Sequence, residues 1–108
     1  MPLFEDRERA EETRYARRQE MVFRIKARRN KMLALWAAEK MGKSGAEARR
    51  YATEFARRDI ADHNDDALIA RIRDEFLAEG IFVHDDEIRR HIEKFGRSAA
   101  QQLAPTPR

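Results

Sequence analysis

The sequence contains no cysteine and little proline or glycine. It has four glycines and three prolines among 108 residues, and two of the prolines stand near the end, at Pro105 and Pro107. Without cysteine the chain forms no disulfide and has no thiolate nucleophile, which excludes a disulfide-stapled secreted scaffold. Because no proline interrupts the chain between Leu3 and Ala104, long helices are expected.

Long apolar segments are missing as well. Nowhere do about eighteen apolar residues stand together, so no membrane-spanning helix is expected. Residues 1–6 lack the apolar core of a secretory signal. We therefore expect a cytoplasmic protein of one domain that does not insert directly into a membrane.

Charge is what the sequence has in abundance. Charged residues make up 40% of the chain, with a net charge of +3. In residues 5–20, eleven of sixteen residues are charged, and the only apolar ones are Ala10, Tyr15 and Ala16. Such a segment favours a helix but has no apolar stripe to hold it on a core. We predict that residues 1–20 form a mobile arm, a frayed helix or a disordered segment in the free protein.

An apolar stripe of helical period begins at Met21 and predicts the first helix of a globular domain. The stripe consists of Met21, Ile25, Met32, Leu33, Leu35 and Trp36. Gly42 is expected to end this helix in the left-handed conformation. The second helix is then expected to begin at a capping box formed by Ser44 and Glu47. Its apolar face is expected to hold Ala48, Tyr51, Ala52, Phe55 and Ile60.

Two further helices follow from the same kind of pattern. Residues 63–66 are expected to end the second helix and cap the third, which stops at Gly80. Asp85 and Asp86 suit the start of the fourth helix, which is expected to fray from Gly96. The apolar faces of these two helices hold Leu68, Ile69, Ile72, Phe76 and Leu77, and Ile88, His91, Ile92 and Phe95. The sequence thus predicts an all-α four-helix bundle with a long first helix, a globular domain over 21–97 and a flexible tail over 98–108.

No motif in the sequence indicates catalysis. Gly42-Lys43-Ser44 resembles the end of a phosphate-binding loop, but Ala37 stands where that loop needs glycine and no strand precedes it. The three histidines stand apart, and no carboxylate lies alone on an apolar face. We expect a protein that is not an enzyme and that binds no cofactor and no metal.

A basic stretch follows the arm. Residues 17–31 hold seven basic residues and one acidic residue, Glu20. This excess is typical of a solvated helix face, or of a docking surface for an acidic partner. The candidate docking residues are Arg24, Arg28, Arg29 and Lys31.

Three stretches together resemble a known family. Residues 4–11 read FEDRERAE, residues 27–42 read ARRNKMLALWAAEKMG, and residues 44–48 read SGAEA. This combination resembles the zeta subunit of alphaproteobacterial ATP synthases, the ATPase inhibitor subunit zeta family. The resemblance covers roughly residues 3–95, and residues 27–42 carry its most specific part.

The resemblance implies a four-helix inhibitor of ATP hydrolysis with a mobile N-terminal segment. That segment enters a catalytic α/β interface of the F-type ATP synthase head, becomes helical and touches the γ rotor stalk, which blocks rotation in the hydrolytic direction. The partners are then the α, β and γ subunits, and the protein is peripheral to the inner membrane through the synthase. Candidate contact residues in the arm are Leu3, Phe4, Asp6, Arg7, Arg9, Ala10, Arg14 and Tyr15.

Two other functions are compatible with a basic helical protein. One is nucleic-acid binding through residues 17–31, but the chain also carries 20 acidic residues and the arm itself is acidic by one charge. The other is a structural dimer in which the first helix forms a coiled coil. Residues 5–20 lack the repeating apolar positions that a coiled coil needs, so we expect a monomer in the free state.

Overall fold

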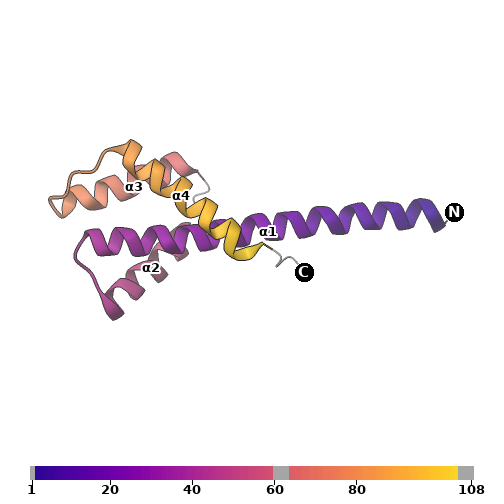
Figure 1. The fold of residues 1–108 in the computed structure, drawn as a ribbon, viewed down its shortest axis with the longest axis horizontal. Helices are drawn as coiled ribbons and strands as arrows, with labels where there is room; N and C mark the ends of the chain where they lie inside the picture. The colour runs from indigo at the N-terminus through magenta and orange to yellow at the C-terminus, as the bar shows by residue number, and fades with distance from the viewer. Residues whose placement is uncertain (1, 60–63, 105–108) are drawn as a thin grey trace.

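A computed structural model describes residues 2–59 and 64–104 of the chain (Figure 1). Over these two ranges the chain forms four α-helices and no strand. The helices are α1 (Pro2–Lys40), α2 (Gly45–Asp59), α3 (Asp65–Ala78) and α4 (Asp85–Leu103). The all-α class and the long first helix are therefore confirmed.

Helix α1 dominates the shape of the molecule. It has 39 residues, about 58 Å at the usual rise per residue, in a molecule whose longest dimension is 66 Å. The helix begins at Pro2 rather than near Met21, because nothing in the intervening sequence breaks it. Figure 1 shows its first half projecting away from the other three helices.

Two helices end in the same left-handed turn, at the two glycines where the sequence predicted that they stop. Gly42 follows α1 with φ of +80°, and the amide of Lys43 donates to the oxygen of Ala38 at 2.8 Å. Gly80 follows α3 with φ of +74°, and the amide of Ile81 donates back into the last helical turn at 2.8 Å. Both turns satisfy carbonyl groups that a helix end leaves without partners.

The capping box predicted at the start of α2 is wrong. The carboxylate of Glu47 accepts a bond from Lys43 Nζ at 3.3 Å and not from the backbone of Ser44. Gly45 has φ of +56°, so the residue after Ser44 is outside the right-handed helical region. A capping serine needs helical residues directly after it, and this turn removes them.

The start of α3 matches the prediction where the structure describes it. The side chain of Asn64 accepts a hydrogen bond from the amide of Asp66 at 2.8 Å, as an N-cap residue does. His63, expected in the same cap, and Ile60, expected on the face of the second helix, lie outside the described residues.

The end of α4 differs from the prediction. The helix continues through Gly96 to Leu103, so a flexible tail starting at residue 98 is wrong for residues 98–103. Two tertiary contacts explain the extension. Ala99 is fully buried, and Gln102 accepts a hydrogen bond from Arg28 of α1 at 3.1 Å.

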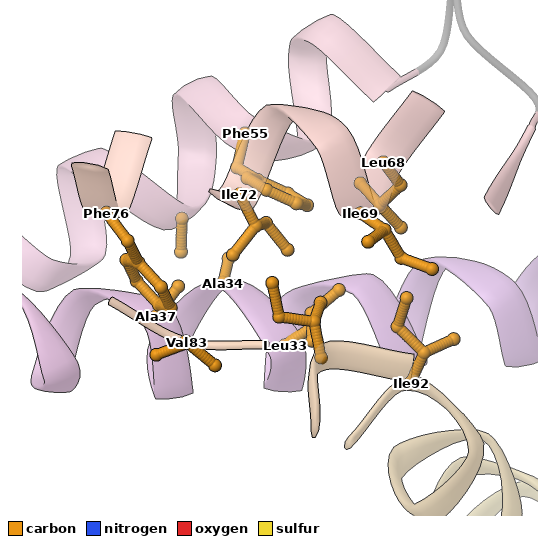
Figure 2. Packing of buried hydrophobic residues seen from close by; sticks show 12 residues of the cluster. Leu33, Ala34, Ala37, Phe55, Leu68, Ile69, Ile72, Phe76, Val83 and Ile92 are labelled. Carbon is orange, nitrogen blue, oxygen red and sulfur yellow. The ribbon is translucent and has the colours of Figure 1, made fainter. Parts of the chain in front are cut away.

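The core lies between α1 and the other helices (Figure 2). Helix α1 packs against both α2 and α4, and α3 packs on α4. Alanines on α1 let its neighbours approach closely, while larger side chains from the other helices fill the space. The core residues labelled in Figure 2 are Leu33, Ala34, Ala37, Phe55, Leu68, Ile69, Ile72, Phe76, Val83 and Ile92.

Two leucines expected on apolar faces are instead exposed. Leu35 is 39% exposed because it lies two residues from both Leu33 and Ala37, on the other side of α1. Leu77 is 51% exposed because it lies one residue beyond the buried Phe76. The buried stripe of α1 is thus narrower than the sequence suggested and consists largely of small residues.

Trp36 lies at the edge of the core rather than at its centre. Its indole stacks on the His91 ring with centroids 4.0 Å apart, and it meets Phe76 edge to face at 5.6 Å. His91, predicted on the apolar face of α4, is half-buried, and its Nδ1 lies 2.9 Å from the carbonyl oxygen of Glu87. The pair covers one side of the core and links α1 to α4.

These positions predict different losses of stability when the side chains of Phe55 and Trp36 are replaced by alanine. Phe55→Ala should lower the free energy of unfolding by about 3–5 kcal/mol, because Phe55 is fully buried between helices. Trp36→Ala should cost less, because part of the indole already contacts solvent. Urea denaturation of both variants measures the difference. An unchanged midpoint for Phe55→Ala, or a larger loss for Trp36→Ala, would contradict this description of the core.

Candidate partner-binding surface

The arm is an exposed helix in this structure. Every described side chain in residues 5–20 is exposed, and Tyr15 retains 60% of its accessible surface. The side chains of Leu3 and Phe4 lie outside the described part of the chain. Of the two forms predicted for the arm, the structure has the helical one. Its mobility in solution stays a prediction.

The charges of the arm have no partners within the described chain. No ion pair joins any side chain of residues 5–20 to another described residue. The one side-chain hydrogen bond that residues 5–20 make with a described residue runs from Thr13 Oγ1 to the carbonyl oxygen of Arg9, 2.9 Å away. The guanidinium and carboxylate groups of the arm are therefore available to a second molecule.

The predicted contact residues of the arm do not form a single face. Arg7, Ala10 and Arg14 are spaced three and four residues apart, so they lie on one side of the helix. Tyr15 shares a different side with Glu11 and Arg18. A partner that contacted all of the candidates would have to surround the helix.

Arg29, predicted as a docking residue, is engaged within the bundle. Its side chain is only 12% exposed and lies 3.2 Å from a carboxylate oxygen of Asp65, the first residue of α3. Its Nε also donates to Asn30 Oδ1 at 3.0 Å. This side chain fastens the start of α3 to α1.

The other three basic residues remain on the surface. Arg24, Arg28 and Lys31 are spaced four and three residues apart and share an exposed side of α1. Phe23, on the same stretch, is 66% exposed and was not predicted as a contact residue. It lies two positions after Met21, on the other side of the helix from the predicted stripe, and this position is the signal that could have identified it.

A polar cluster joins α2 to α3. The hydroxyl of Tyr51 donates a hydrogen bond to Glu75, and Arg71 Nε donates to the same carboxylate at 3.3 Å. The Arg71 guanidinium also lies 4.3 Å above the ring of Phe55. Burial, the bond to Glu75 and the nearby negative charge raise the pKa of Tyr51, in that order of size. The phenol therefore stays protonated and serves as a donor between helices.

The structure also describes the Gly42-Lys43-Ser44 segment, the possible metal ligands and the character of the helices. Gly42-Lys43-Ser44 joins two helices, as predicted, and no strand precedes it. Within residues 2–59 and 64–104, no group of three histidine, aspartate or glutamate side chains could hold a metal ion. None of the described helices combines the length and the apolar character that crossing a membrane requires.

The fold and surface together define a class: a small helical bundle that extends one charged helix far beyond its core. The family model of ATPase inhibitor subunit zeta matches residues 1–102, and the chain belongs to that family. The resemblance seen in the sequence is thereby confirmed. No curated protein and no solved structure matches the chain.

The hydrogen bond of Tyr51 predicts a loss of stability in alkaline solution. Because folding raises this pKa, the stability that the hydrogen bond of Tyr51 contributes is fully present below about pH 10 and is lost as the pH rises through the higher pKa of the folded protein. The stability difference between the parent and Tyr51→Phe should therefore stay constant up to about pH 10 and shrink as the pH is raised further. Tyr15→Phe is the control, since that phenol is exposed. Urea denaturation across this range checks the prediction, and a constant difference would contradict it.

Proposed function

We propose that the protein inhibits ATP hydrolysis by the catalytic head of the F-type ATP synthase. In this proposal the arm enters a catalytic interface between an α and a β subunit as a helix and rests against the γ subunit of the rotor stalk. A helix held there blocks rotation in the hydrolytic direction. Membership of the zeta family supports the inhibitory role, and the properties of the arm support this route.

The observation that carries the proposal is the exposed, helical and unpaired state of residues 5–20. A helix that makes no tertiary contact is maintained by its own propensity and by its continuity with the packed part of α1. Binding such a segment breaks no interaction of the bundle. Since the backbone is already helical, less conformational entropy is lost when the arm is held by a partner.

The distribution of side chains around the arm fits insertion between two subunits. Arg7 and Arg14 lie on one side, where their guanidinium groups suit carboxylates of one wall. Tyr15 lies about a quarter turn around the helix from them and suits an apolar pocket beside those carboxylates. Asp6, Arg9 and Ala10 complete the inserted turns, and Leu3 and Phe4 provide apolar groups at the tip.

The bundle limits how far the arm enters. A helix with its side chains is about 10–12 Å across, whereas the two shorter dimensions of the molecule are 31 and 25 Å. A cleft that admits the arm therefore excludes the bundle, which stays on the outer surface of the head. The protein is in this way a cytoplasmic subunit, peripheral to the inner membrane through the synthase.

Deleting residues 2–18 should separate inhibition from folding. The arm contacts nothing in the described bundle, so the melting temperature followed by circular dichroism should stay nearly unchanged. Inhibition of ATP hydrolysis by the isolated head should be lost. A truncated protein that still inhibits fully would show that the bundle alone blocks the enzyme.

A matched pair of charge reversals refines this test. Arg7→Glu with Arg14→Glu should weaken inhibition and reduce its sensitivity to salt, because attraction to carboxylates on the head is removed. Arg49→Glu with Arg90→Glu is the control, since both residues are exposed on the bundle. Equal effects of the two pairs would indicate a general charge effect and no specific contact of the arm.

A further inference from the structure

A second apolar surface lies at the base of the arm, where α1 enters the bundle. Phe23 and Ala27 stand one turn apart on α1, and Leu103 reaches the same place from the end of α4. These residues line a shallow depression together with three basic side chains. We call it the composite surface, and it consists of Phe23, Arg24, Ala27, Arg28, Lys31 and Leu103.

The composite surface exists only because α4 continues to Leu103. The helix passes through Gly96, where a Cβ atom would meet Cδ of Arg29 on α1 at 3.6 Å, an ordinary contact distance. Ala99 is then fully buried, and Leu103 comes to rest near Phe23. Figure 1 shows the end of α4 lying across the middle of α1. The surface is thus a product of the folded bundle and not of the arm.

The ionisable side chains of the composite surface are all positively charged. All three ionisable residues that line it, Arg24, Arg28 and Lys31, are basic. Arg28 donates to Gln102 Oε1 at 3.1 Å, a neutral acceptor that orients the guanidinium and leaves its charge uncompensated. An oriented guanidinium beside an exposed phenyl ring favours a partner that combines carboxylates with apolar side chains.

We propose that the composite surface is a second docking site, which takes an acidic and apolar segment of the catalytic head beside the cleft that the arm enters. This inference rests on the proposed function. The surface lies on the same helix as the arm, directly next to its base, so a head that holds the arm also meets Phe23 and Leu103. A symmetric dimer through this surface does not fit, because the same cations would face each other across the contact.

Inhibition of the isolated head by the full-length chain tests the inference. Phe23→Ala combined with Leu103→Ala should raise the half-inhibitory concentration by about ten- to thirtyfold, as expected for loss of apolar anchors. Arg24→Glu with Lys31→Glu should act in the same direction. The matched control is Leu77→Ala with Phe82→Ala, which removes apolar side chains that are 51% and 73% exposed at the other end of the bundle. The control should inhibit like the parent.

Melting curves keep the result interpretable. Phe23→Ala alone should leave the melting temperature unchanged, because the ring is 66% exposed, and it should still weaken inhibition. A parent protein that does not inhibit would overturn the proposed function and this inference together. A parent that inhibits, with composite-surface variants equal to it, would overturn only this inference. Dimerisation in sedimentation experiments, or binding to duplex DNA, that is abolished by these variants would also overturn it.

Discussion

The structure depends on one apolar face that only the second half of α1 carries. Leu33, Ala34 and Ala37 are completely buried there, and α2 and α4 both pack on this helix. Because the buried face begins near Asn30, the first half of the helix has nothing to cover it. A single element therefore holds the bundle together and carries the arm away from it. Loosening the packing on this face would remove the support on which the arm is presented.

Helix ends were predictable wherever local chemistry determines them. Gly42 and Gly80 adopt left-handed conformations that other residues rarely reach, and Asn64 caps α3 through its own side chain. Gly96 could not be assigned in this way, because burial of Ala99 and the hydrogen bond from Arg28 to Gln102 keep the chain helical beyond it. The capping box predicted at Ser44 could not be tested from the sequence either. Gly45 takes a positive φ in the turn between α1 and α2, and this conformation prevents the box from forming.

The candidate site was predictable only in part. Exposure of the arm followed from its composition, since a segment without an apolar stripe cannot be buried. Counting charges along residues 17–31 could not show that Arg29 pairs with Asp65, which is 36 positions away in the sequence. For the same reason the sequence could not predict that Leu103 lies near Phe23. Contacts between distant positions decide which cations are structural and which remain available to a partner.

Amide hydrogen exchange of the free protein and of its complex with the catalytic head tests the central claim, that the arm is the inserted element. In the free protein, residues 5–18 should exchange fast and residues near Leu33 should exchange slowly, because only the latter are packed. In the inhibited complex, residues 5–18 should become protected while the core changes little. An arm that still exchanges fast in a fully inhibited complex would contradict the account.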